Sequence, residues 1–313
     1  MTTLDRLDRW KATGVITADQ HLLLGSLVRQ ERFSLFVEIN ALLYIGVLSA
    51  VGGLAWTARD YVLNLGDGVI LAVLGLLIAA SFYYCFSRGV PYDNGEVESP
   101  SMIFDYVLYF GCLVLSATLA FIETRFAIFK GWSTHLFIAS VVFGLLAYRF
   151  DNRFVLSLAI STLAGYLGLE IDAFDLAGTN LLRLTALVFG TTLGGLGVWL
   201  HRQGIKPHFL ETYVHIGANV IMLATVSGVL EPGIGWLYLA ALLSLSAAAI
   251  YIGIRFNRFA FVAYGTLYGY AGVSARLLES IGGPTMAMLY FIVTGMIIVI
   301  GLVVLARRFG RDE

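Results

Sequence analysis

One apolar stretch in the second half of the chain carries an unusual set of polar side chains. They recur at i, i+3, i+7 and i+11, which places them on one face of an α-helix: His208, Glu211, His215 and Asn219. Ionisable groups are costly inside a membrane and therefore mark candidate functional sites. A carboxylate with an imidazole one turn away can take up and release a proton, or bind a cation or a polar solute.

A second apolar stretch, 106 residues earlier, has a related arrangement. Asp105 corresponds there to Glu211, and Tyr109 corresponds to His215, so each stretch presents a carboxylate followed one turn later by a second titratable group. We predict a binding site made by Asp105, Tyr109, Glu211, His215 and Asn219. The alternative is interhelical hydrogen bonding near the membrane surface, with both carboxylates facing arginine-containing turns.

The same residues give a weaker indication of metal binding. His208, Glu211 and His215 have donor types that suit zinc, but their spacing differs from the His-Glu-x-x-His of a metalloprotease. The sequence also has no nucleotide-binding loop, nucleophile elbow or dinucleotide fingerprint. We therefore expect no metal, no cofactor and no enzymatic activity.

The composition indicates which elements must position these side chains. Of the 313 residues, 58% are hydrophobic and 13% are charged, and the mean hydropathy is +0.82. Soluble domains have about 25% charged residues, so this composition excludes that class. With 20 Lys and Arg against 21 Asp and Glu, there is no basic excess to bind a nucleic acid.

The apolar runs predict an all-α fold, a polytopic transmembrane helical bundle that contacts the lipid bilayer. A membrane-spanning helix needs about 20 mainly apolar residues. Our count is ten spans, within a range of eight to ten. They cover residues 39–57, 68–87, 102–122, 134–148, 154–169, 181–200, 209–230, 234–254, 259–274 and 284–306.

The distribution of basic residues predicts the orientation of these spans. With ten spans, both termini lie on one side, and that side collects 15 of the 20 Lys and Arg residues. Cytoplasmic loops carry such an excess. We therefore expect a multi-pass protein of the cytoplasmic membrane with both termini in the cytoplasm.

Residues 1–36 predict a cytoplasmic amphipathic helical hairpin ahead of the membrane domain at 37–313. One face of its first helix is apolar, through Leu4, Leu7 and Trp10. This face is a candidate for self-association or for docking of a protein partner. Gly14 is expected to end the first helix with a positive φ. Thr17 and Gln20 have the spacing of a capping box for the second.

The pattern Leu-x-x-Trp-x-x-x-Gly-x-Ile-Thr at 7–17, followed by many apolar spans, resembles a bacterial family. It is similar to the membrane proteins grouped as domain-of-unknown-function family 2157. The resemblance covers about a tenth of the chain. It implies a bacterial inner-membrane protein with this hairpin at its N-terminus, and it implies no activity and no functional residues.

An internal repeat is a further prediction. Arg-Phe-Asp-Asn-Arg-Phe at 149–154 recurs, with one residue deleted, as Arg-Phe-Asn-Arg-Phe at 255–259. The offset covers four helices, so the two copies are parallel, repeat A at about 68–172 and repeat B at about 176–279. The turns carry candidate contacts for lipid headgroups or other anions, which are Arg149, Arg153, Arg255 and Arg258. The alternative is plain positive-inside anchoring, with sharp turns at Asn152 and Asn257.

Two Gly-x-x-x-Gly pairs, Gly190 with Gly194 and Gly265 with Gly269, lie inside apolar spans. There they predict close helix contacts.

Three classes of function remain open. The first is a transporter or permease for a small solute or lipid, with its path between the repeats. The second is a non-transporting scaffold or sensor that acts through the N-terminal hairpin. The third, an intramembrane enzyme, would need a nucleophile or metal site that the sequence does not display.

Overall fold

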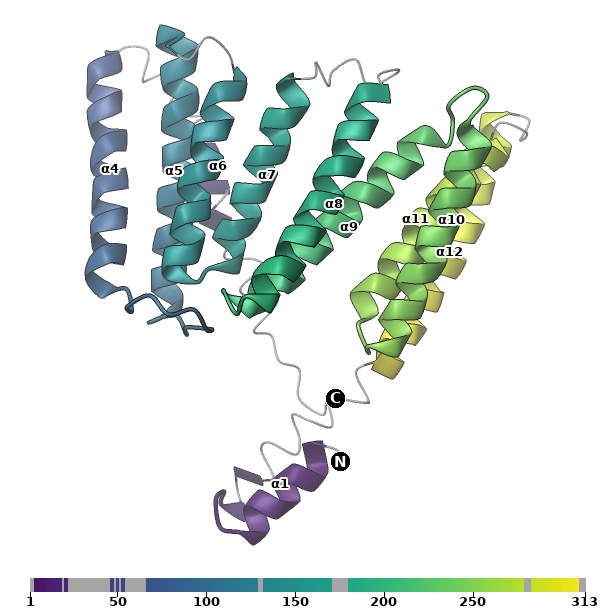
Figure 1. Ribbon diagram of the computed structural model, residues 1–313, viewed down its shortest axis with the longest axis horizontal. Coiled ribbons are helices and arrows are strands. Elements are labelled where there is room, and N and C mark those ends of the chain that lie inside the picture. The colour runs from purple at the N-terminus through teal and green to yellow at the C-terminus, as the bar shows by residue number, and fades with distance from the viewer. Residues whose placement is uncertain are drawn as a thin grey trace. The chain divides into compact units, whose positions relative to one another are not determined.

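The computed structural model describes the chain in several segments, and every regular element in them is a helix (Figure 1). The described residues are 3–18, 20–21, 46–47, 49–50, 52–53, 66–128, 132–170, 180–278 and 283–309. The chain divides into two compact units, one of residues 40–221 and one of residues 1–39 with 222–313. Each unit is described by itself below.

The unit of residues 40–221 contains the helices that carry the candidate site. They are α4 (Asp67–Arg88), α5 (Met102–Phe126), α6 (Trp132–Phe150), α7 (Arg153–Glu170), α8 (Asn180–Arg202), the short 3-10 helix η1 (Pro207–Phe209) and the first part of α9 (Leu210–Gly228). Side chains fix two of the helix starts. The Ser101 hydroxyl accepts from the Phe104 amide at the start of α5. The Asn152 side-chain oxygen, Oδ1, accepts from the Val155 amide at the start of α7.

The other unit contains the two ends of the chain. Its described helices are α1 (Thr3–Ala12), the end of α9, α10 (Gly235–Arg255), α11 (Phe259–Leu278) and α12 (Pro284–Phe309). Helices α11 and α12 are joined by polar pairs as well as apolar contacts. The Tyr270 hydroxyl lies 2.7 Å from the Thr294 hydroxyl, and the Ser274 hydroxyl lies 3.0 Å from the Tyr290 hydroxyl.

Seven helices among the described residues are long and apolar enough to cross a membrane. They are α4, α5, α6, α8, α10, α12 and the continuous segment of η1 and α9, and each coincides with a predicted span. Helices α7 and α11 coincide with two further predicted spans, but α7 is shorter and α11, which is rich in Tyr and Gly, is less apolar. The first predicted span, 39–57, lies almost entirely outside the described residues. The helices are those of an integral membrane protein, and the count of ten spans stays a prediction.

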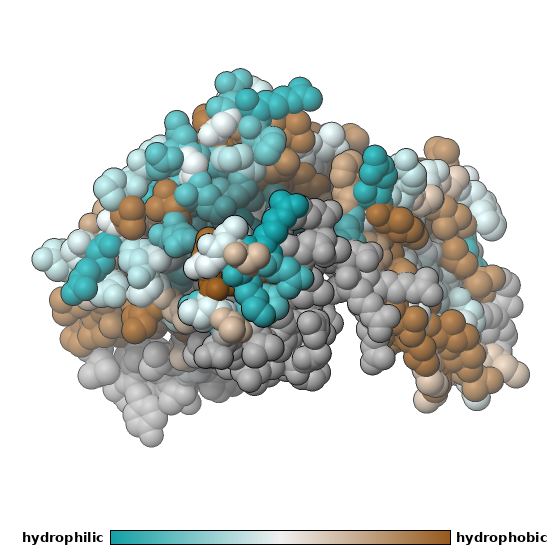
Figure 2. Space-filling view, turned by 90° about the horizontal axis from the view of Figure 1, so that it is seen from below, coloured by the Kyte–Doolittle hydropathy of each residue, from teal (hydrophilic) through white to brown (hydrophobic). Residues whose placement is uncertain are grey.

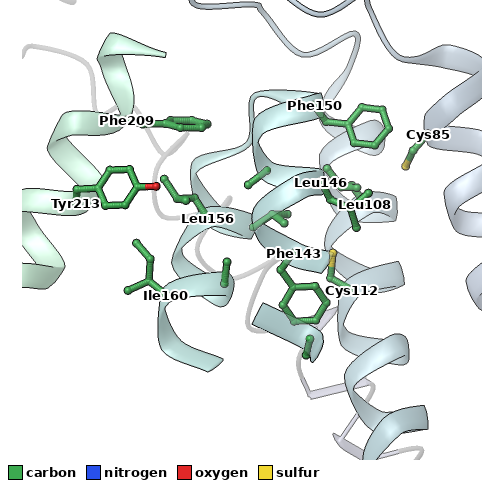
Figure 3. Packing of buried hydrophobic residues seen from close by; sticks show 14 of the residues in the cluster. Cys85, Leu108, Cys112, Phe143, Leu146, Phe150, Leu156, Ile160, Phe209 and Tyr213 are labelled. Carbon is green, nitrogen blue, oxygen red and sulfur yellow. The ribbon is translucent and has the colours of Figure 1, made fainter. Parts of the chain in front are cut away.

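Apolar side chains from α4 to α9 pack into one core within residues 40–221 (Figure 3). Phe104 and Phe150 meet edge to face with ring centroids 5.6 Å apart, and Tyr148 meets Phe209 in the same way at 5.2 Å. In Figure 3, Phe209 of η1 and Tyr213 of α9 extend toward Leu156 of α7. This core lies next to the helix connections described below, so it holds those connections in place.

Glycines allow close helix crossings in both units. A Cβ added to Gly190 would lie 2.8 Å from the Gly217 carbonyl oxygen, so α8 and α9 touch through their backbones. Gly265 and Gly269 likewise approach Ser246 of α10. Gly194 contributes its backbone nitrogen to the α8–α9 crossing, but a side chain there would meet no atom within 4 Å. The predicted close contacts are confirmed for the other three glycines.

The N-terminal segment has the predicted turn and cap. Gly14 has a φ of +74°. The amides of Thr17 and Gln20 each donate to the side chain of the other residue, at 2.9 and 3.2 Å. Beyond residue 21 the second helix lies outside the described residues, as does the side chain of Leu4.

Two residues of the predicted apolar face of the first helix, Leu7 and Trp10, differ in exposure. Leu7 is buried, whereas Trp10 is 47% exposed. The chain turns back after α1, since the amides of Val15 and Ile16 donate to the Trp10 carbonyl oxygen. Asp8 is also hydrogen-bonded to His21, at 2.7 Å.

Candidate functional site

Three helix connections of the 40–221 unit meet at one buried carboxylate, Asp151. It lies in the turn between α6 and α7, and its side chain is 2% exposed. One carboxylate oxygen accepts from the Val97 amide at 2.6 Å and from Lys206 Nζ at 2.9 Å, while the other is paired with His208 Nε2. Val97 belongs to the α4–α5 loop, and Lys206 precedes η1, so Asp151 ties all three connections together (lower ends of these helices in Figure 1).

The Lys206 side chain is as deeply buried as that of Asp151. It is 1% exposed, and Nζ also donates to the Gly95 carbonyl oxygen at 3.0 Å. The ring of Tyr92 lies 5.1 Å from Nζ, a cation–π arrangement. A buried ion pair of this kind is tolerable only when further hydrogen bonds satisfy both ions. We call Asp151, Lys206 and His208, with the loop at 92–97, the polar clamp.

The backbone at the clamp is strained. Asp151 and Lys206 have φ values of +56° and +46°, a region that non-glycine residues rarely occupy. Such strain persists only where the surroundings over-determine the conformation, and it concentrates at functional sites. The prediction of a sharp turn at Asn152 was wrong by one residue. Asp151 ends α6 with a positive φ because the Asn152 amide donates back to the Ala147 carbonyl oxygen, which leaves the Asn152 side chain to cap α7.

The α10–α11 turn has the same backbone geometry. Asn257 has a φ of +52°, and the Arg258 amide donates to the Gly253 carbonyl oxygen at 2.8 Å. Asp151 and Asn257, which are 106 residues apart, thus share a left-handed backbone conformation in the two turns. This geometry aligns the two turns without the predicted one-residue deletion, and the repeat itself stays a prediction.

Asp105 lies at the first turn of α5, beside the clamp. Its carboxylate accepts from the Ser99 hydroxyl and from the Asn152 side-chain amide, both at 2.9 Å. Both of these hydrogen-bond donors to Asp105, a hydroxyl and an amide, are uncharged. The partial positive charge of a helix N-terminus also favours an anion at this position.

Glu211 lies at the first turn of α9 and faces Arg153, the residue that follows Asn152 at the start of α7. Arg153 approaches it at 3.5 Å and pairs more closely with Glu96, at 3.0 Å. His215, one turn further along α9, has Nε2 3.7 Å from the other oxygen of Glu211. Asp105 and Glu211 are thus brought to consecutive residues, Asn152 and Arg153, at the start of α7.

The other two predicted site residues lie apart from this meeting point. Asn219 donates to the carbonyl oxygen of His215 in its own helix at 2.8 Å. Tyr109 is half-buried, one turn along α5 from Asp105. The structure therefore places the two carboxylates and His215 around the start of α7, while the Asn219 amide engages its own backbone.

The arginines of the two turns differ in their surroundings. Arg149 donates to the Val90 carbonyl oxygen at 2.8 Å, and Arg153 bonds to Glu96 and Glu211. Arg255 and Arg258 are both exposed. The predicted headgroup contacts at the α6–α7 turn would thus compete with bonds inside the protein.

A small pocket lies at the clamp, on the side of the α4–α5 loop. Its walls include Tyr92, Val97, Phe104, Arg149, Asp151 and Lys206. Figure 2 shows hydrophilic residues gathered on the face seen from below, bordered by hydrophobic ones. Among the residues that the structure describes, no three His, Cys, Asp or Glu side chains are grouped as a metal site would require. His208 and His215 have different carboxylate partners.

Reasoning from the sequence missed the clamp itself. In the sequence, Asp151 is one residue of the Arg-Phe-Asp-Asn-Arg-Phe turn, and Lys206 is one of the 15 basic residues on the predicted cytoplasmic side. The pair is separated by 55 positions, and no spacing rule connects them. The one available signal was that His208 stands two residues after Lys206, at the start of the polar face.

No family model matches the chain, and no curated protein or solved structure matches it. The functional conclusion therefore rests on the geometry of the site.

Proposed function

We propose that this protein is a transporter or permease for a small solute or lipid of the bacterial cytoplasmic membrane, with both termini in the cytoplasm. The observation that carries the proposal is the convergence of Asp105 and Glu211 on the start of α7. Carboxylates on two apolar helices are costly to keep, and here both face a common turn instead of lipid. The solute path then runs between α5 and α9.

The surroundings of the carboxylates suit reversible binding. The two neutral donors of Asp105 leave its charge available to a cation, a proton or a hydroxyl-bearing solute. Glu211 and His215 form an acid–imidazole pair that can exchange a proton. We therefore expect a solute with a cationic or hydroxyl group, bound at the predicted cytoplasmic end of the helices.

The polar clamp acts in this proposal as the closed gate of the same end. It joins the α4–α5 loop, the α6–α7 turn and the α8–α9 connection through one buried ion pair. Opening would break the ion pair and expose both ions to water. Their hydration would then offset the lost Coulomb attraction. A buried ion pair is thus suited to a contact that must form and break.

Matching crossings in the predicted repeats support this scheme. Gly111 of α5 packs against Ser81 and Phe82 of α4, and Gly217, 106 residues later in α9, packs against Gly190 of α8. The α6–α7 and α10–α11 turns also share their backbone geometry. We propose on this basis that residues 68–172 and 176–279 are parallel repeats, an arrangement that also occurs in known transporters.

A thermal-shift screen of the detergent-solubilised protein tests the proposed function. The library contains amino acids, nucleosides, sugars, metals and lipids at two pH values. We expect a stabilising solute, since binding at a hundredfold excess over the dissociation constant contributes about 2.7 kcal/mol. The stabilisation should disappear in Glu211→Gln and Asp105→Asn and persist in Glu98→Gln, which changes an exposed carboxylate of the α4–α5 loop. A solute whose effect is unchanged in both site variants would contradict the proposed site.

The second candidate function is a scaffold or sensor. The exposure of Trp10, together with Val15 at 68%, favours it, because large apolar side chains exposed on and just after the polar helix α1 suit self-association or a protein partner. No response to any compound in the screen, with the site variants folding normally, would favour this candidate. The resemblance to family 2157 is compatible with both functions.

A further inference from the structure

The α10–α11 turn exposes one arginine and one phenylalanine, Arg255 and Phe256, at positions where the α6–α7 turn has a hydrogen-bonded arginine and a buried phenylalanine. Phe150 is 7% exposed and packs in the core, whereas Phe256, at the corresponding position, is 67% exposed. Arg149 donates to a backbone carbonyl oxygen, whereas Arg255 is exposed beside Phe256. Two turns of the same backbone geometry thus have different surroundings.

The end of α12 lies beside this turn. The rings of Phe259, at the start of α11, and Phe309, at the end of α12, meet edge to face with centroids 5.8 Å apart. Residues 307 and 308, immediately before Phe309, are both arginines. A second pair of basic residues therefore lies in the last turn of α12, next in sequence to the ring that contacts the α10–α11 turn.

The boundary between apolar and basic residues places this cluster at the level of lipid headgroups. On α12, Val303 and Val304 are about half exposed, and the arginines follow within four residues. Ile254 on α10 is also exposed and directly precedes Arg255. In a membrane these apolar surfaces face acyl chains, so the guanidinium groups of Arg255 and Arg258 lie where phosphates are.

From these observations we propose that the α10–α11 turn and the end of α12 bind the phosphate headgroup of an anionic phospholipid. Guanidinium groups bind phosphate oxygens through two parallel hydrogen bonds, and an exposed aromatic ring suits the membrane interface. The occupant is a bilayer lipid, because Phe256 and the apolar ends of α10 and α12 offer contacts to acyl chains that free phosphate lacks. This site is independent of the proposed transport function.

The test uses the full-length protein in detergent micelles containing either phosphatidylglycerol or phosphatidylcholine. Arg255→Gln/Arg258→Gln removes two charges from the turn. The matched control, Arg88→Gln/Arg202→Gln, removes two exposed charges from other helix ends on the same predicted side. We expect phosphatidylglycerol to raise the melting temperature of the wild type and of the control, and at least half of this shift to be lost in Arg255→Gln/Arg258→Gln.

Native mass spectrometry gives a second readout that does not depend on melting behaviour. The wild type and the control should retain phosphatidylglycerol in preference to phosphatidylcholine, and the turn variant should lose that preference. Inorganic phosphate at the same concentration should give no stabilisation. An unchanged lipid effect in the turn variant, an equal loss in the control, or an equal effect of inorganic phosphate would each overturn the proposal.

Discussion

Replacing Asp151 with asparagine is expected to lower the free energy of unfolding by about 3–5 kcal/mol, the usual cost of removing one partner from a buried ion pair. Lys206 would remain buried at 1% exposure with its charge uncompensated. Asparagine tolerates the left-handed backbone conformation of this position and is nearly the same size, so the substitution tests the charge. Equilibrium unfolding in detergent micelles measures the change.

Two variants show whether the loss comes from the ion pair. In Asp151→Asn/Lys206→Met both charges are gone, and we expect most of the stability to return, because an apolar side chain can replace a buried cation. Glu98→Gln changes an exposed carboxylate of the α4–α5 loop outside the clamp and should stay within about 0.5 kcal/mol of the wild type. A loss of less than about 1 kcal/mol in Asp151→Asn would show that the pair contributes little.

Gly217→Ala is the second substitution with a large expected effect. Its new Cβ would lie 2.7 Å from the Gly190 carbonyl oxygen, and neither atom belongs to a side chain that can rotate away. Helices α8 and α9 would have to separate, at a cost of about 1–3 kcal/mol. The same unfolding measurement, with Gly217→Leu as a more severe variant, gives the magnitude.

Gly194→Ala is the matched control for that prediction. It lies on the same helix as Gly190, but an added Cβ would meet no atom within 4 Å. Since alanine favours helix over glycine by about 1 kcal/mol, this variant should be neutral or more stable. Equal destabilisation by the two alanine substitutions would contradict the close α8–α9 crossing.

Local patterns in the sequence predicted much of the fold. Apolar runs of about 20 residues located the membrane helices, because a backbone in lipid must satisfy its own hydrogen bonds. The positive φ of Gly14 and the reciprocal bonds of Thr17 and Gln20 also followed from short-range rules. All of these features depend on residues a few positions apart.

The features that the sequence did not predict depend on distant residues. The bond between Lys206 and Asp151 exists only because helices α6 to α9 bring two connections to the same end. The different exposures of Leu7 and Trp10, three residues apart on one helix, depend on tertiary contacts that the apolar pattern of the helix does not contain. Asp105 and Glu211 were found from their spacing, but their contacts with the start of α7 required coordinates.

The gate is the part of the proposed function that a direct distance measurement can test. Spin labels at Glu98 and Arg202, both exposed, would report the separation of the α4–α5 loop and the end of α8. Cys85 and Cys112, which are buried, are first replaced by alanine so that only these two positions are labelled. Labels at Phe137 and Phe154, exposed on α6 and α7, report whether the helices themselves remain folded.

We predict one narrow distribution between positions 98 and 202 in the wild type, and a longer and broader one in Asp151→Asn. The distance between positions 137 and 154 should be the same in both proteins, since the α6–α7 hairpin does not open. Identical distributions between positions 98 and 202 in wild type and variant would contradict the account, because the polar clamp would then not close this end of the helices.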